Sequence, residues 1–170
     1  MSNEIIQIGN NILRLVSEPV VKEHVGSPTF QKFVKKMQKI LSGSPDGVAL
    51  AAPQIGKNLR IFVLSPRTFG ENITTNEHLI YINPIIKKRS VSKKEYDEGC
   101  LSVRNIYGHI KRSEKVTIEA LDEHGRKFAR GGSGLLAEIF QHEIDHLDGI
   151  LFVDKAKNLR EIKPDETRRN

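Results

Sequence analysis

The chain has 170 residues, which suits one domain with a hydrophobic core of its own. Its 27 Lys and Arg residues exceed its 21 Asp and Glu residues, giving a formal net charge of +6, but no basic stripe interleaved with aromatic residues indicates a sequence-specific nucleic-acid site. A single cysteine, Cys100, excludes an intrachain disulfide, and with neither a signal peptide nor a bilayer-long apolar run we expect a cytoplasmic protein without a membrane partner.

The first clear element is a helix that begins near Ser27. Ser27 suits the N-cap position and Pro28 the first helical position. The apolar residues that follow recur at helical spacing, namely Phe30, Phe33, Val34, Met37, Ile40 and Leu41. This pattern predicts an amphipathic helix whose lysines face solvent.

Residues 47–56, GVALAAPQIG, are mostly small. Small residues at this density let two backbones approach closely or let a ligand bind against a strand edge, although a tight structural turn is the alternative. Within this stretch, the neutral amide of Gln54 can donate a hydrogen bond to a developing oxyanion without transferring a proton.

Short apolar segments with strand character follow at residues 59–64 and 79–82. Pro84 then removes a backbone donor, so we expect residues 85–89 to form an edge strand or a separate strand. Residues 116–120 have the pattern of a strand that enters a hairpin turn.

The stretch SGLLAEIFQHEIDHLDG, residues 133–149, predicts a helix that is buried on several sides, because its apolar residues surround most of the helical axis. Ser133 suits the N-cap, and Asp148 with Gly149 suits the C-terminal end. The helix nevertheless contains ionisable residues in an HExxH arrangement, and burying them is costly unless they pair or bind a metal.

His142 and His146 lie one helical turn apart on one face, so both imidazoles can reach a single ion. Glu143 lies to one side of that face, where it can contact a water molecule at the ion, and Asp145 lies to the other side. Helical geometry alone therefore does not identify the general base. A core helix with two hydrogen-bonded histidines is the alternative interpretation.

A catalytic centre of this kind needs a third protein ligand, and Cys100 in the stretch EGCLS is the candidate. Gly99 removes steric bulk beside the thiol. A set of one Cys and two His ligands suits Fe²⁺, Zn²⁺, Co²⁺ or Ni²⁺. The alternative is that Cys100 is a small buried apolar residue.

Several short strands followed by one buried helix predict an α+β fold, with short, mostly antiparallel strands folded around the central helix that carries HExxH. We expect residues 1–154 to form a single metallohydrolase domain. Residues 155–170 are highly charged and are expected to form a partly helical or frayed tail.

The chain resembles the peptide deformylases in three motifs that occur in the family's order. These are GVALAAPQ at residues 47–54, EGCLS at 98–102 and QHEIDH at 141–146. The likeness covers nearly the whole chain up to about Asp154. It implies removal of the N-formyl group from the initiator methionine of nascent polypeptides, with possible docking on the ribosome surface.

The resemblance also implies roles for individual residues. Cys100, His142 and His146 would hold one divalent ion, with Fe²⁺ expected as the native ion and Zn²⁺, Ni²⁺ or Co²⁺ as alternatives. Glu143 would take up and deliver the proton. The Gln54 amide and the Leu101 N–H would hold the oxyanion. Val48, Ala49 and Leu101 would contact the substrate. A methionine pocket would be lined by Leu135, Ile139 and His142. A pair between Glu98 and Arg112 would brace the loop that carries Cys100.

Two residues depart from the family's pattern. Ala49 replaces a glycine, and its Cβ is expected to point toward the path of the substrate backbone, while Arg104 replaces a proline. These differences leave room for a related hydrolase of other N-acyl peptides. A non-catalytic, ribosome-associated metal protein is a further alternative, against which the intact Glu143 argues. An HExxH endopeptidase would leave EGCLS and Gln54 unexplained.

Overall fold

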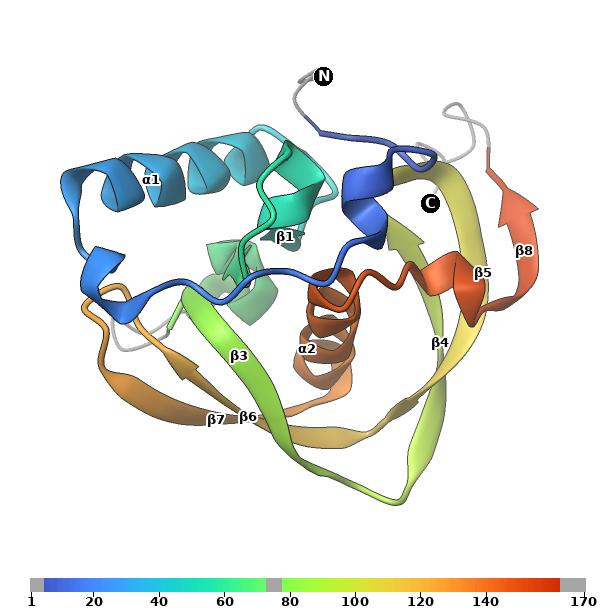
Figure 1. Cartoon of the computed structure of the whole chain (residues 1–170). Coiled ribbons are helices and arrows are strands. Elements are labelled where there is room, and N and C mark those ends of the chain that lie inside the picture. The colour runs from blue at the N-terminus through green and yellow to red at the C-terminus, as the bar shows by residue number, and fades with distance from the viewer. Residues whose placement is uncertain (1–4, 73–77, 163–170) are drawn as a thin grey trace.

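A computed structural model describes residues 5–72 and 78–162 and shows strands that curve around a central helix (Figure 1). The helices are α1 (Pro28–Ser42) and α2 (Gly134–Leu147), with short 3₁₀ helices η1 (Asn11–Arg14), η2 (Lys22–His24), η3 (Ala52–Ile55), η4 (Pro66–Asn72) and η5 (Phe152–Asp154). The strands are β1 (Ala49–Ala51), β2 (Ile61–Leu64), β3 (Ile80–Arg89), β4 (Lys93–Cys100), β5 (Val103–Ser113), β6 (Lys115–Leu121), β7 (Lys127–Ser133) and β8 (Lys157–Glu161).

The strands form two sheets whose strand pairs are antiparallel. One has the order β1-β2-β3-β6-β7 and the other has the order β4-β5-β8. Helix α2 lies between the two sheets (Figure 1). The expected α+β fold, with antiparallel strands around the HExxH helix, is therefore confirmed.

Helix α2 has the ends that the sequence predicts. Ser133 occupies the N-cap position, although its side chain accepts no capping hydrogen bond, and Asp148 occupies the C-cap. Gly149 follows with φ of +74°, and a Cβ there would lie 2.6 Å from the carbonyl oxygen of Arg14. Only glycine fits this helix end. Among the described helices, none is long and apolar enough to cross a membrane.

Helix α1 also matches its prediction. The Ser27 hydroxyl accepts a hydrogen bond from the N–H of Phe30 at 3.3 Å, and Pro28 begins the helix. Its apolar face packs into a core cluster with β1, β2 and the first half of β3, through Phe30, Val34, Met37, Ile40 and Leu41. The lysines Lys32, Lys35, Lys36 and Lys39 are exposed.

Strand β3 contradicts the expected break at Pro84, because it is one strand from Ile80 to Arg89. It pairs with β2 only as far as Ile82, so the missing N–H of Pro84 costs no hydrogen bond to β2. A register shift between Ile82 and Ile85 absorbs the irregular backbone, with Asn83 at φ of +51°. The Asn83 side chain completes the bulge by bonding both the N–H and the carbonyl of Val20 at 2.8 Å.

The expectation of a helical or frayed tail is wrong for residues 157–161, which form β8 and pair with β5. Figure 1 shows β8 alongside β5 at the edge of the smaller sheet. A Cβ at Gly108 on β5 would lie 2.7 Å from the Leu159 side chain, so the small residue lets the two strands approach. The rest of the expected tail, residues 163–170, lies outside the described residues.

Candidate metal centre

The fold brings the three predicted metal ligands together between β4 and α2. Cys100 is the last residue of β4, and His142 and His146 lie one turn apart on α2. The Cys100 Sγ lies 3.2 Å from the His146 Nε2, and the ligand atoms of all three residues lie within 4.8 Å of one another.

This spacing fits a single divalent ion. Metal–sulfur and metal–nitrogen bonds of about 2.3 Å and 2.0 to 2.1 Å in a tetrahedral site place ligand atoms roughly 3.3 to 3.6 Å apart. The observed distance of 3.2 Å between Cys100 Sγ and His146 Nε2 is close to that range. One soft thiolate and two imidazoles are also the donor set that Fe²⁺ and Zn²⁺ accept.

The surroundings of Cys100 favour the thiolate form. Burial raises the pKa of the Cys100 thiol, but the charges and hydrogen bonds of His146 and His142 outweigh burial and hold the pKa at about 5. Because the thiolate is the form that binds metals, Cys100 needs little further deprotonation at neutral pH.

His142 is held by a buried ionic network. Its Nδ1 lies 2.9 Å from Glu98 Oε2, which leaves Nε2 for the metal. Arg112 donates to both Glu98 oxygens, from Nε at 2.7 Å and from a terminal nitrogen at 2.9 Å. This confirms the expected Glu98–Arg112 pair. Burial raises the pKa of Glu98, but the bonds from Arg112 and His142 lower it to about 2.

Glu143 and Asp145, which helical geometry does not distinguish, differ in their hydrogen-bond partners. Asp145 accepts hydrogen bonds from Arg112 and, at 2.8 Å, from Lys155, so its charge is neutralised by two cations. Glu143 is buried, and its Oε2 has no hydrogen-bond partner among the described residues. Burial raises its pKa, while the charges of His142 and His146 oppose that change. Glu143 is the carboxylate suited to proton transfer.

Gln54 faces the centre in one fixed orientation. Its Oε1 accepts a hydrogen bond from the Ala51 N–H at 2.8 Å, and its Nε2 donates to Ser102 Oγ at 3.0 Å. The same nitrogen lies 3.6 Å from Cys100 Sγ. The amide N–H₂ group is therefore aimed at the metal ligands. Leu101 lies between Cys100 and Ser102 in the turn after β4.

The residues around the cysteine explain the glycine before it. A Cβ at Gly99 would lie 2.6 Å from the Tyr107 ring on the neighbouring strand β5. No side chain fits this position without moving Tyr107. Gly99 therefore sets how closely β4 approaches β5 immediately before the thiol.

The structure places the expected substrate residues in different environments. Val48 is half-buried and Leu135 is exposed. Ile139 is buried in the core cluster between α2 and the larger sheet. The Ala49 methyl group is in the same cluster and is 6 % exposed, contrary to the expectation that it points toward the substrate. Arg104 is exposed beyond the cysteine turn.

Sequence patterns did not identify every residue that supports the centre. Ser102 orients the Gln54 amide, and Gln7 donates to the Leu101 carbonyl at 3.0 Å. Asp145 and Lys155 complete the network around Arg112. Gln7 is 94 positions from Leu101, so no local pattern indicates the contact. The sequence signalled only Ser102, through its place in EGCLS, and Asp145, through its place in QHEIDH.

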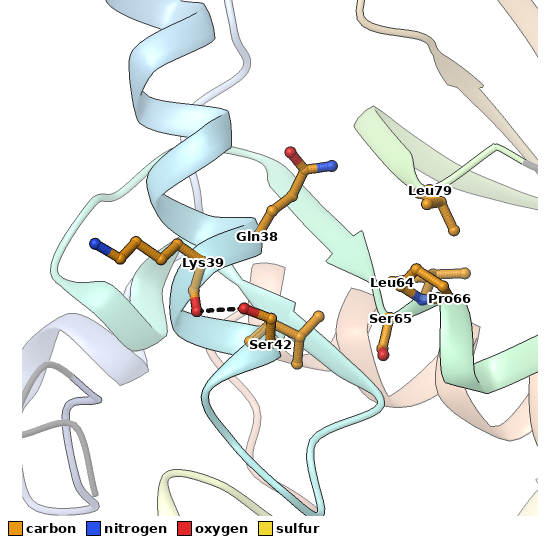
Figure 2. A pocket seen from close by; sticks show the side chains of 8 residues that line it. Gln38, Lys39, Ser42, Leu64, Ser65, Pro66 and Leu79 are labelled. Atoms are coloured by element: carbon orange, nitrogen blue, oxygen red, sulfur yellow. Dashed lines mark hydrogen bonds between the residues drawn. The ribbon is translucent and has the colours of Figure 1, made fainter.

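A cavity of about 360 Å³ lies elsewhere, between the C-terminal half of α1 and the end of β2 (Figure 2). Its lining includes Gln38, Ser42, Ser65 and Pro66, and it includes no ligand of the candidate centre. The Ser42 hydroxyl in its wall donates to the carbonyl of Lys39 at 2.8 Å, as Figure 2 shows. This cavity is therefore separate from the candidate centre.

Comparison with known proteins gives a consistent result. Residues 2–161 match the family model described as polypeptide deformylase. A peptide deformylase of Treponema pallidum (strain Nichols) is 38% identical over 155 residues, 90% of this chain and 87% of the relative, and peptide deformylase 2 of Clostridium acetobutylicum is 42% identical over 145 residues, 85% and 89%. The crystal structure of a peptide deformylase from Legionella pneumophila matches with a TM-score of 0.80 and 39% identity, covering 91% of this chain and 85% of that one. The chain belongs to the polypeptide deformylase family.

Proposed function

We propose that the centre formed by Cys100, His142 and His146 removes the N-formyl group from the N-terminal methionine of nascent polypeptides, with Glu143 transferring the proton. The family activity is hydrolysis of this formyl amide, which gives formate and a free amine. The observation that carries the assignment is the meeting of three ligand side chains from two distant motifs within 4.8 Å.

Each group of the chain has a defined task in this hydrolysis. Cys100, His142 and His146 would hold a divalent ion, which would supply Lewis-acid chemistry by lowering the pKa of a water molecule towards neutral. Glu143 accepts the proton of the attacking water and delivers it to the leaving amine. Burial raises the pKa of Glu143, which makes the protonated form accessible for that delivery.

The oxyanion is assigned to Gln54 and to the backbone N–H of Leu101. The bond from Ala51 fixes Gln54 so that its N–H₂ group faces the ligands before substrate arrives. A donor that needs no reorientation contributes about 3 kcal/mol to transition-state binding in comparable sites. Val48 and Ala49, on and beside β1, are proposed to bind the peptide as an added strand.

Substitution of the two carboxylates tests the assignment of the base. In a formate-release assay with formyl-Met-Ala-Ser, Glu143→Gln is expected to lower kcat by about 10² to 10⁴-fold, because it removes proton transfer but no metal ligand. Asp145→Asn is the matched control, since Asp145 already accepts bonds from Arg112 and Lys155. Metal content is measured on each variant and should stay near one ion per chain. A larger loss of kcat in the Asp145 variant would reverse the assignment.

The same assay separates the alternatives. A non-catalytic metal protein would release no formate, and a hydrolase of other N-acyl peptides would prefer acetyl-Met-Ala-Ser to the formyl substrate. An endopeptidase would cleave casein.

We further propose Fe²⁺ as the native ion and the cytoplasmic ribosome surface as the place of action. The donor set is compatible with Fe²⁺ as it is with Zn²⁺, and the family resemblance selects Fe²⁺ between them. The net charge of +6 supports docking on the anionic ribosome. Metal analysis after oxygen-free purification tests the ion. Co-sedimentation with ribosomes at increasing salt tests docking, which should weaken as salt rises.

A further inference from the structure

The turn that joins β3 to β4 is strongly basic. Residues 87–94 read KKRSVSKK, and residues 78–94 include no Asp or Glu. The Lys and Arg side chains of this turn are exposed, as is Lys115 at the start of β6. Residues 87–94 together with Lys115, called the basic turn below, are thus a concentrated positive region on a chain whose net charge is only +6.

Hydrogen bonds tie the turn to the start of β6. The Ser90 hydroxyl donates to the carbonyl of Ser92 at 2.9 Å and accepts from the Lys115 N–H at 3.0 Å. The Ser90 N–H donates to the Lys115 carbonyl at 2.9 Å, and the Glu114 N–H donates to the Ser92 carbonyl at 3.1 Å. The cations therefore project from a backbone that is already ordered, which lowers the entropic cost of binding a partner.

Acidic side chains offset only part of this charge. Glu119 lies 3.6 Å from Lys87, and Glu95, the first acid after the turn, lies 4.0 Å from His109. Within the described ranges, the other members with no ion pair are Lys88, Arg89, Lys93 and Lys115. Like charges gathered on one turn raise the local positive potential, which an anionic partner would relieve.

The basic turn lies at the opposite end of β4 from the candidate centre. Lys93 begins this strand and Cys100 ends it, so at about 3.3 Å per residue up to roughly 23 Å separates them. Figure 1 shows the turn between β3 and β4 projecting at the bottom of the view, away from α1. A partner that binds the turn would therefore leave the centre open to a peptide.

The proposed function, on which this step rests, indicates which anionic partner fits. Nascent polypeptides emerge from the ribosome, whose RNA carries closely spaced phosphates that Lys and Arg neutralise without reading base sequence. A lipid surface fits less well, because membrane-binding segments present an extended apolar face. Val91, which is 97% exposed, is the one apolar residue among residues 87–94.

We propose that the basic turn binds the phosphate backbone of ribosomal RNA and so holds the enzyme where formyl peptides emerge. The contact is electrostatic and independent of base sequence. Its strength therefore falls steeply as the salt concentration rises.

Titration of purified large-subunit ribosomal RNA with the full metal-loaded chain, at about 50 to 200 mM KCl, tests this inference. The triple variant Lys88→Gln/Arg89→Gln/Lys93→Gln is expected to bind at least about tenfold more weakly. The slope of log affinity against log salt should become shallower by about 2 to 3, because each lost phosphate contact removes about one unit of slope.

The matched control is Lys32→Gln/Lys35→Gln/Lys39→Gln on α1, which removes the same charge from exposed positions. It should leave the affinity within about twofold and the slope nearly unchanged. Val91→Lys adds a cation to the turn and is expected to tighten binding and steepen the slope by about one, a gain that loss of structure cannot produce.

Equal losses of affinity in the two triple variants would overturn the inference, as would binding to vesicles of anionic lipid in place of RNA. All variants should release formate from formyl-Met-Ala-Ser as fast as the unsubstituted chain does. An unsubstituted chain that releases formate but does not bind ribosomal RNA would overturn this inference alone, whereas absence of formate would overturn the proposed function.

Discussion

The side chain of Ala49 packs in a different place from the one that the sequence suggests. The family pattern has glycine at this position, and the sequence alone suggests interference with substrate. The methyl group instead packs in the cluster that joins α2 to the larger sheet. The face of the sheet to which a side chain points depends on the register of its strand. The register of β1 is set by its pairing with β2, and its own three residues do not reveal it.

Ala49→Gly is therefore expected to lower the free energy of unfolding by about 1 to 2 kcal/mol, from lost burial and added backbone entropy. KM for formyl-Met-Ala-Ser should change little. Ala129→Gly on β7 is the control, because its methyl group is exposed and only the backbone contribution applies. Denaturant titration measures both variants, and a lower KM for Ala49→Gly without loss of stability would show that the methyl group does contact substrate.

The candidate metal ligands were predictable from the sequence because few residue types bind metals and the HExxH spacing fixes two of them on one helical face. Helical geometry alone did not distinguish Glu143 from Asp145, and only the family resemblance implied Glu143. The distinction depends on Arg112 and Lys155, which reach Asp145 from a different strand and from beyond the helix. Local patterns contain no information about such contacts.

At the level of elements, Glu98 joins β4, β5 and α2 through Arg112 and His142. Its folded-state pKa of about 2 lies below the ordinary value of 4.5. A carboxyl with a lowered folded pKa stabilises the fold fully above about pH 4.5 and loses that contribution as pH falls toward 2. The contribution is about 3 kcal/mol.

Denaturant titration from pH 6 to pH 2 tests this linkage by comparing the unsubstituted chain with Glu98→Gln. The difference in unfolding free energy should be constant above about pH 4.5 and should shrink below it, because only the unsubstituted chain then takes up a proton at Glu98. Glu119→Gln is the control, since Glu119 is exposed. A difference that does not vary across this range would show that Glu98 carries no such linkage.

Helices were more predictable than strands for physical reasons. The ends of α1 and α2 are marked by local residues, Ser27 with Pro28 and Asp148 with Gly149. The continuity of β3 through Pro84 depends instead on where its partner β2 ends and on the bonds from Asn83 to Val20. Those partners are distant in sequence.

For the whole molecule, β8 extends the smaller sheet to a third strand although its sequence is strongly charged. All five of its residues are exposed, so its charged side chains stay in solvent. Its backbone pairs with the edge strand β5, so a charged sequence does not mean a disordered segment here. Arg160 also forms a salt bridge with Asp97 on β4. An element whose side chains are all exposed is therefore still part of this fold.

Two truncations test the contribution of β8. Removal of residues 157–170 is expected to lower Tm by several degrees and promote aggregation, because it exposes the β5 edge. Removal of residues 163–170 is the control and should leave Tm within about a degree. Thermal unfolding followed by circular dichroism measures both, and equal Tm values would show that β8 adds no stability.

The proposed function requires three side chains to hold one ion, and X-ray absorption spectroscopy at the metal edge tests this most directly. With protein purified without oxygen, we predict one sulfur neighbour at about 2.3 Å and two imidazole nitrogens at about 2.0 to 2.1 Å. The sulfur signal should disappear in Cys100→Ser. A bound ion surrounded only by nitrogen and oxygen in the unsubstituted protein would contradict the proposed centre.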